Sequence, residues 1–482
     1  MLFNSLEFGI FLFVVFAVYW ILNKGAILVQ NSFLLVASYF FYGWWDWRFL
    51  FLILLSTMVD YFIGLQIEKS NNQKHSKLLL FASLTVNLGV LFYFKYFNFF
   101  IESFSEAFTF FGHHIESSRL NIILPVGISF YTFQTLSYTI DVYRKELKAE
   151  ESLVSFATYV SFFPQLVAGP IERAKNLLPQ FSKRKVFDYG FAKSGLQLML
   201  WGFFKKIVIA DNCAVFANAI FNNHLDYNGY SLILGALFFT FQIYGDFSGY
   251  SDIAIGTARL FGFNLMRNFA FPYFSRDIAE FWRRWHISLS TWFRDYVYIP
   301  LGGSRGSLLK KIRNTFIIFI VSGLWHGANW TFITWGALNA LYFMPLLLLG
   351  KNRQNVTIIG DGKLLAGIKE VLPMLWTFAL TVIAWIFFRS QTLGQALEIL
   401  YRIFSLHSSA IDFVFTKKVW LLVIYLIIFL VIEWLGRSRE NPIDLDDRLS
   451  KPIKWGFYLV LAVLILDNFS NSTSQEFIYF DF

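Results

Sequence analysis

The feature that most constrains this chain is the number of long apolar stretches along it. Crossing the hydrocarbon core of a bilayer takes about 20 mostly apolar residues in a helix, with a usual range of 17–25. Such stretches recur from one end of the sequence to the other: 8–22, 31–43, 49–66, 78–98, 121–140, 190–210, 229–244, 314–330, 331–349, 371–388, 418–435 and 455–469. Several are short, so we expect some to tilt, to lie in the interface or to enter and return. We predict roughly eleven spans of this length class.

Composition excludes the other classes of protein. Of the 482 residues, 56% are apolar and 15% are Asp, Glu, Lys or Arg, whereas ordinary globular chains are about 25% charged. A soluble chain of this length would divide into domains with polar surfaces, and disordered, collagen-like or disulfide-rich chains have different compositions. The sequence predicts an all-α polytopic membrane protein. Without repeats or long linkers, 1–482 is expected to be a single integral-membrane domain.

Net charge and cysteine content further restrict the binding partners and the kinds of site that we expect. A net charge of +9 in so apolar a chain indicates loops held on the cytoplasmic side, not nucleic-acid binding. The basic loops 67–77, 171–185 and 276–313 are therefore expected on that face. The single Cys213 excludes an intrachain disulfide and a multi-cysteine metal site. Stretch 8–22 has no basic residue before it and no small-residue cleavage site after it, so we expect a membrane helix, not a signal peptide.

Segment 152–170 lies between two loops that we expect on the cytoplasmic side. Pro164, Gly169 and Pro170 would interrupt a helix there, and irregular backbone at membrane depth needs protein or a watery cavity around it. A re-entrant element and a plain kinked span both remain open.

Two of the seven histidines lie in apolar, aromatic surroundings. His326 lies thirteen residues beyond Arg313, about 20 Å along a helix, and far from Lys351. A titratable group at such depth is costly, and it usually faces a cavity, pairs internally or acts in function. Gly323 and Gly327 flank it at the spacing that lets helices approach closely. A purely structural histidine is the alternative.

The second histidine, His286, lies in a segment (276–306) that a helical wheel predicts to be amphipathic. Arg283, Arg284 and Arg294 share its basic flank, and His286 falls at the edge of the apolar arc. Such a helix lies at the interface or covers a cavity mouth, so an anchoring role and a functional role are both open. Forty residues separate the two histidines, and that spacing establishes no contact.

Other chemistry lacks sequence support. Segment 244–256 holds Asp246, Ser248, Ser251 and Asp252 but not a nucleophile elbow, and helix packing is its simpler explanation. No nucleotide-binding, dinucleotide-binding or zinc-hydrolase motif is present in the sequence. We expect no metal site.

Several long motifs, in one order, resemble the membrane-bound O-acyltransferase (MBOAT) family, in particular its bacterial alginate O-acetylation branch. They are PVGISFYTFQTLSYTIDVYR (125–144), SFFPQLVAGPIERAKNLLPQF (161–181), WGFFKKIVIADN (201–212), YGDFSGYSDIAIGTARLFGFNLMRNFAFPY (244–273), FWRRWHISLSTWFRDYVYIPLGGSR (281–305), SGLWHGANWTFITWGALNA (322–340) and a terminal FIYFDF (477–482). The resemblance runs almost end to end and is densest over 120–345. Asp481 replaces the branch's usual Gln, a difference without an explanation in the sequence.

The resemblance implies a fold, a location and a site. The fold would be a ring of tilted helices, with re-entrant or interfacial helices, around a central tunnel, in the bacterial cytoplasmic (inner) membrane. The family's catalytic membrane histidine falls on His326, and its second polar position, near the tunnel, falls on His286. No cofactor would be bound permanently. A thioester donor, expected to be acetyl-CoA, would enter from the cytoplasm.

The function expected on this basis is O-acetylation of an exported polysaccharide (alginate-like, cellulose or peptidoglycan) through a periplasmic or membrane-anchored acetyltransferase partner. His326 would act as general base or acyl carrier. Arg283, Arg284 and Arg294 would attract donor phosphates, with simple topology as the alternative, and Asn329 or backbone amides would stabilise the oxyanion. D-alanyl or other acyl transfer from a carrier protein, and a non-enzymatic transporter, are the alternatives. The sequence identifies neither the polymer that is acetylated nor the oligomeric state of the protein.

Overall fold

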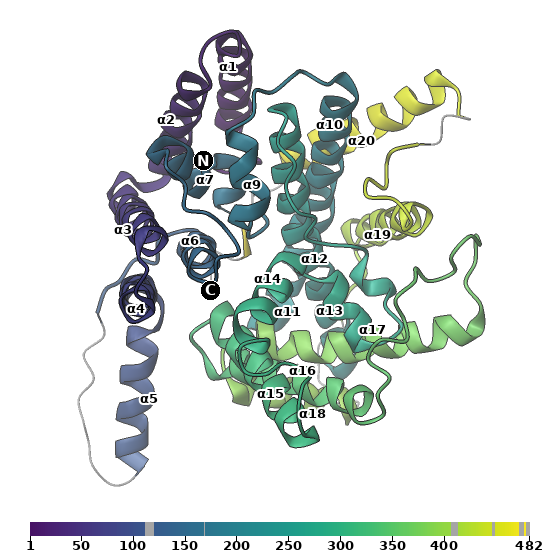
Figure 1. Cartoon of the computed structure of the whole chain (residues 1–482). Coiled ribbons are helices and arrows are strands. Elements are labelled where there is room, and N and C mark those ends of the chain that lie inside the picture. Colours follow the sequence, from purple (N-terminus) through teal and green to yellow (C-terminus); the bar gives the residue numbers. More distant parts are fainter. Residues whose placement is uncertain (111–119, 168, 406–412, 446–448, 472–476, 479–482) are drawn as a thin grey trace. The chain divides into compact units, whose positions relative to one another are not determined.

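The computed structural model describes residues 1–110, 120–167, 169–405, 413–445, 449–471 and 477–478. All regular elements in this part of the chain are helical (Figure 1), which confirms the all-α class. The chain packs into two compact units, one formed by Met1–Ala192 with Thr257–Met266 and the other by Lys193–Gly256 with Arg267–Phe482. The expected single domain and ring of helices around a tunnel stay predictions.

The first unit holds the N-terminal helices. They are α1 (Leu6–Leu22), α2 (Ile27–Asp46), α3 (Leu50–Lys69), α4 (Gln73–Leu91), α5 (Phe97–Phe110), α6 (Ile128–Tyr143), α7 (Leu153–Ser161), α8 (Phe163–Leu166) and α9 (Ala174–Phe181). A 3₁₀ turn (Trp47–Phe49) joins α2 to α3, and a π-helical turn (Phe92–Tyr96) joins α4 to α5.

A buried carboxyl group joins three helices of the first unit. Asp60 of α3 accepts hydrogen bonds from Ser83 and Asn87 of α4 and from Thr139 of α6, and its side chain is fully buried. In an apolar solvent, such interhelical polar contacts supply the association that the hydrophobic effect cannot.

The second unit holds the other helices and both candidate histidines. They are α10 (Tyr189–Phe203), which begins in the first unit, α11 (Asp211–Asn222), α12 (Gly229–Leu260), whose end from Thr257 belongs to the first unit, α13 (Ile278–Arg284), α14 (Ile287–Phe293), α15 (Leu308–His326), α16 (Trp330–Leu348), α17 (Ile368–Arg389), α18 (Leu393–Phe404), α19 (Lys417–Gly436) and α20 (Lys451–Asn471). π-helical segments follow α10 (Phe204–Ala210) and α14 (Arg294–Tyr298), and a 3₁₀ turn covers Pro272–Phe274.

Seven helical stretches in the described residues are long and apolar enough to cross a membrane. They are Ile27–Lys69, Gln73–Phe110, Gly229–Leu260, Trp330–Leu348, Ile368–Arg389, Lys417–Gly436 and Lys451–Ser470. This confirms a polytopic protein but falls below the predicted eleven. The difference has a physical reason. Helices α1, α6 and α10 are short, with 17, 16 and 15 residues, and α15 has 19 residues but carries Lys310, Lys311 and Arg313 near its start.

Segment 152–170 is not a plain span. Helix α7 has nine residues and α8 has four, too few to cross about 30 Å of hydrocarbon at 1.5 Å per residue. The helix breaks at Phe162, where the backbone is not helical (φ −52°, ψ 109°). Pro164 lies in the first turn of α8, where a missing N–H costs nothing, so it does not interrupt a helix. The re-entrant arrangement remains the prediction for this segment.

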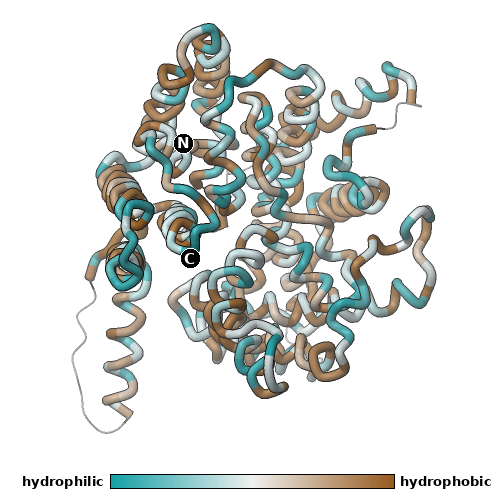
Figure 2. Tube along the Cα trace, in the orientation of Figure 1, coloured by the Kyte–Doolittle hydropathy of each residue, from teal (hydrophilic) through white to brown (hydrophobic). Residues whose placement is uncertain are grey.

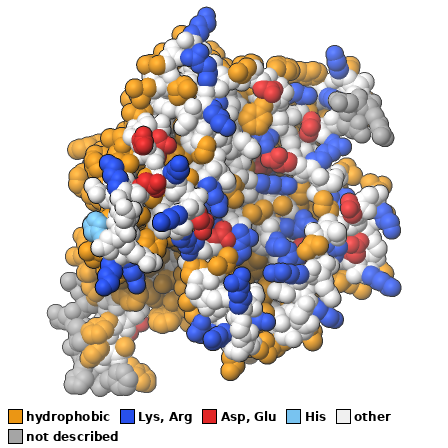
Figure 3. Space-filling view, in the orientation of Figure 1, with side chains coloured by type: hydrophobic (Ala, Val, Ile, Leu, Met, Phe, Trp, Pro, Cys, Tyr) orange, Lys and Arg blue, Asp and Glu red, His pale blue; other side chains and the backbone are white. Residues whose placement is uncertain are grey.

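Apolar side chains remain exposed along the helices of both units. Figure 2 shows apolar residues along much of α3 and α19, and large apolar side chains such as Phe51, Ile427 and Val460 are exposed. On the face drawn in Figure 3, basic side chains are more prominent than acidic ones, in keeping with the net charge of +9. Exposed apolar helix surfaces are expected where lipid replaces water.

Candidate functional site

The structure places the two candidate histidines side by side within the second unit. The ring centroids of His286 and His326 are 6.3 Å apart with the planes inclined at 60°. The side chains are 1% and 2% exposed, respectively. Two imidazoles at this distance can both contact one small group held between them.

Aromatic rings enclose His326. It is the last residue of α15, where Gly327 turns the chain into an extended conformation. The rings of Trp325, Trp335 and Phe388 meet the imidazole edge-on at centroid distances of 5.0, 5.1 and 5.4 Å. These residues come from α15, α16 and α17, so three helices shape the surroundings of the imidazole. An apolar shell of this kind strengthens electrostatic interactions with a reacting group.

His286 does not lie on a continuous amphipathic helix. The helical-wheel prediction that placed its side chain at the edge of an apolar arc is therefore wrong. Helix α13 ends at Arg284, Trp285 is extended, and His286 itself is left-handed with φ 43°. The break turns the imidazole toward Phe247 of α12, at a centroid distance of 4.6 Å, and toward His326.

Hydrogen bonding and burial define the state of His286. Its Nδ1 lies 3.1 Å from Oδ1 of Asn268. Burial lowers the pKa of His286 to about 3, because a charged imidazole loses its hydration in an apolar environment. The ring is therefore neutral at pH 7.

The three arginines predicted to attract donor phosphates all have protein partners. Arg283 donates to the carbonyl groups of Asn352 and Asn355. Arg284 forms an ion pair of 2.8 Å with Glu280, and Arg294 forms one of 2.7 Å with the adjacent Asp295. Arg283 and Arg294 are both exposed, and the side chain of Arg294 is 57% exposed. Their role toward a donor stays a prediction.

Asn329 caps the helix that follows His326. Its Oδ1 accepts the backbone N–H of Thr331 at the start of α16, and its Nδ2 donates to the carbonyl of Gln391. These bonds use the side chain to fix the turn between α15 and α16. The oxyanion role of Asn329 stays a prediction.

Sequence reasoning missed a buried cluster of charges next to the site helices. Lys206 lies between Asp211 and Asp246 at 2.8 and 2.7 Å, and Lys205 lies 2.8 Å from Asp252. The acids of 244–256 therefore serve ion pairing as well as helix packing. Two adjacent lysines in the apolar stretch 190–210 were the available signal, because a buried cation requires a partner.

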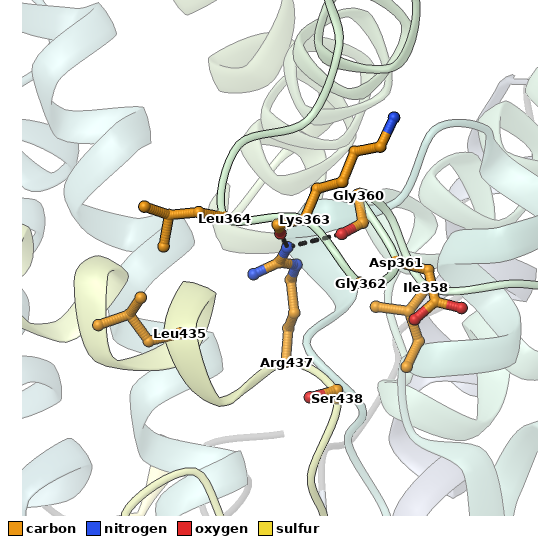
Figure 4. A pocket seen from close by; sticks show the side chains of 9 residues that line it. All are labelled: Ile358, Gly360, Asp361, Gly362, Lys363, Leu364, Leu435, Arg437 and Ser438. Atoms are coloured by element: carbon orange, nitrogen blue, oxygen red, sulfur yellow. Dashed lines mark hydrogen bonds between the residues drawn. The ribbon is translucent and has the colours of Figure 1, made fainter.

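A pocket near α19 has neither His286 nor His326 among its lining residues. It is lined by Ile358, Gly360, Asp361, Gly362, Lys363, Leu364, Leu435, Arg437 and Ser438 (Figure 4). The guanidinium of Arg437 donates to the carbonyl groups of Ile359, Gly360 and Lys363 and lies over the ring of Trp434. The cation therefore holds the loop between α16 and α17 in place.

The family model that matches this chain spans both histidines of the candidate site. A sequence model described as "MBOAT, membrane-bound O-acyltransferase family" matches residues 41–388. The chain is 44% identical over 379 residues to a Pseudomonas aeruginosa protein named probable alginate O-acetylase, covering 78% of this chain and 70% of the relative. It is 36% identical over 429 residues to a peptidoglycan O-acetyltransferase of Helicobacter pylori, covering 83% and 79%.

A third relative is more distant. The teichoic acid D-alanyltransferase of Streptococcus thermophilus is 31% identical over 282 residues, which cover 55% of this chain and 65% of the relative.

Proposed function

This chain belongs to the membrane-bound O-acyltransferase family, and from that premise we propose that it transfers acetyl groups from a cytoplasmic thioester for O-acetylation of an exported polysaccharide. The donor in this proposal is acetyl-CoA. The observation that carries the proposal is the buried pair of His286 and His326 in an aromatic shell.

The chemistry follows from the ring of His326. An alcohol is a weak nucleophile until a base removes its proton, and imidazole is suited to that task near neutral pH. The acceptor oxygen then attacks the thioester carbonyl, the C–S bond breaks, an ester C–O bond forms, and the proton held by His326 passes to the departing thiolate. Transient attachment of the acetyl group to His326 is the alternative course.

The neighbouring His286 is neutral and buried, which suits it to hydrogen bonding with donor or acceptor instead of proton abstraction. Arg283 and Arg294 are exposed and would attract donor phosphates together with Arg284, and Asn329 or backbone amides would stabilise the oxyanion.

Sequence identity to the relatives favours acetyl transfer over D-alanyl transfer. The O-acetylase and O-acetyltransferase relatives are 44% and 36% identical over more than three quarters of this chain, while the D-alanyltransferase is 31% identical over 55%. We propose alginate or a related polymer as the final acceptor. We place the protein in the bacterial inner membrane, where a periplasmic or membrane-anchored acetyltransferase would complete the transfer.

Labelled acetyl transfer tests the proposal. Membranes with the wild-type chain, given labelled acetyl-CoA on the cytoplasmic side, should deliver label to the exported polymer. His326→Ala and His326→Gln should each lower this delivery by about 100-fold or more, the usual scale of general-base catalysis. His75→Gln, which changes an exposed histidine at the start of α4, is the matched control and should leave it unchanged.

Two outcomes would refute parts of the proposal. Full transfer by His326→Gln at equal membrane abundance would remove the catalytic assignment. Transfer only from a carrier-bound D-alanine, with none from acetyl-CoA, would favour the D-alanyl alternative.

A further inference from the structure

We propose that Asn268 is a positioning residue that holds His286 in a single tautomer, with the proton on Nδ1 and the lone pair on Nε2. The inference deepens the proposed function, on which its consequence for acetyl transfer rests. It concerns contacts made entirely within the second unit.

Asn268 receives three donors at one oxygen atom. Its side chain is fully buried, and its Oδ1 lies 3.1 Å from Nδ1 of His286, 3.2 Å from the backbone nitrogen of Ser288 and 2.9 Å from the Ser288 hydroxyl. The backbone N–H can only donate, so the amide must present its oxygen here and not its NH₂ group. The orientation of the amide is fixed by the backbone.

The tautomer of His286 follows from that orientation. A neutral imidazole carries its proton on one ring nitrogen and a lone pair on the other. An amide oxygen can only accept, so Nδ1 must be the protonated nitrogen, and Nε2 is the basic one. Selection of a tautomer by the partner of the other ring nitrogen is a general property of histidine sites.

Asn268 also stabilises the backbone conformation that orients the imidazole ring of His286. His286 precedes α14 in a left-handed conformation and gives that helix no side-chain cap, so the first N–H groups of α14 need another acceptor. The carbonyl of Asn268 accepts from Ile287 N, and its Oδ1 accepts from Ser288 N. One residue from a separate loop thus caps α14 and offsets the strain of a non-glycine residue at positive φ.

The consequence is an oriented hydrogen-bond acceptor beside His326. With Nδ1 occupied, the Nε2 lone pair of His286 is the atom that can accept a proton-bearing group of the substrate. Loss of Asn268 would release the ring to the other tautomer, whose Nε2–H donates instead. Transfer would fall although both histidines remain.

A double-mutant cycle tests this role. Asn268→Ala should slow acetyl transfer by roughly tenfold to 100-fold, within the range for one general acid–base contact. Asn268→Asp, which keeps an acceptor for both N–H groups, should recover most of the rate. In a His286→Gln background, Asn268→Ala should cause no further loss, because residues acting as a unit are not additive. Asn441→Ala is the matched control, a buried asparagine that also accepts a backbone N–H.

A spectroscopic readout separates positioning from mere folding. Protein labelled with ¹⁵N in its histidine rings and placed in bilayers should show one ring protonated at Nδ1, assigned to His286 by its absence in His286→Gln. Asn268→Ala should move that signal toward the Nε2–H form, while thermal unfolding in detergent confirms that the variant is folded.

The outcomes are distinguishable. An unchanged tautomer signal in folded Asn268→Ala, or full additivity with His286→Gln, overturns the inference. If His326→Gln retains full transfer, the proposed function fails while the tautomer measurement still reports on Asn268. If His286→Gln alone retains full transfer, the proposed function stands and the positioning role for catalysis is overturned.

Discussion

At the scale of single residues, the second unit buries several groups of titratable side chains. The imidazole pair is one, and Lys206 between Asp211 and Asp246 is another. The Lys206 and Asp246 side chains are 1% and 3% exposed, so each charge depends on its partners for the solvation that water would supply. A buried ion pair is a weak net contributor to stability, but breaking one is costly.

Lys206→Met should destabilise the protein by about 3–5 kcal/mol, because two carboxylates are left buried without a cation. Lys205→Met is the matched control. The carboxyl partner of Lys205 is Asp252, which is 18% exposed, and water can replace part of the lost contact. Thermal unfolding in detergent measures both. Equal losses of stability in Lys206→Met and Lys205→Met would contradict this ranking. The double variant Lys206→Met/Asp246→Asn should be less destabilised than Lys206→Met, because one of the two buried carboxylates is then neutral.

At the scale of helices, α15 and α16 approach each other closely enough that glycine is required. A Cβ added at Gly323 would lie 2.3 Å from the carbonyl oxygen of Phe332, and one added at Gly336 would lie 2.4 Å from that of Phe319. These are backbone atoms, which cannot rotate away. The expected packing role of Gly323 is therefore confirmed, while Gly327 lies beyond the helix end and faces the ring of Phe332.

Gly323→Ala should separate α15 from α16, destabilise the protein by about 1–3 kcal/mol as overpacking usually does, and reduce acetyl transfer by displacing the nearby His326. Gly456→Ala in α20 is the control, since no atom lies within 4 Å of its added Cβ. Unfolding temperature and transfer rate are measured on both. A Gly323→Ala protein with unchanged stability and rate would refute the requirement for close approach.

At the scale of the whole molecule, the chain combines apolar helices with basic segments. Segments 67–77, 171–185 and 276–313, which include short helices and helix ends, should all face the cytoplasm, because Lys and Arg are retained on that side during insertion. The only cysteine in the sequence, Cys213, is buried, so reporter cysteines can be added without removing it.

Single cysteines at Asn71, Ser182 and Ser304, all exposed positions, should react with a membrane-impermeant maleimide in inverted vesicles and not in intact cells. The parent protein, with Cys213 alone, should remain unlabelled in both preparations. Labelling of any of the three segments from outside the cell would show that the predicted orientation is wrong for that segment.

Sequence alone determined the membrane class, the all-α fold and the family, because hydropathy over about 20 residues and motif order are properties of consecutive residues. It also singled out His326 and His286 by the cost of a titratable group in apolar surroundings. Only the tertiary structure decided that the two rings meet, that the helix breaks at Trp285 and His286, and that Asn268 caps α14. Each of these depends on contacts between residues distant in sequence or on a backbone conformation that such contacts stabilise, and no local pattern contains them.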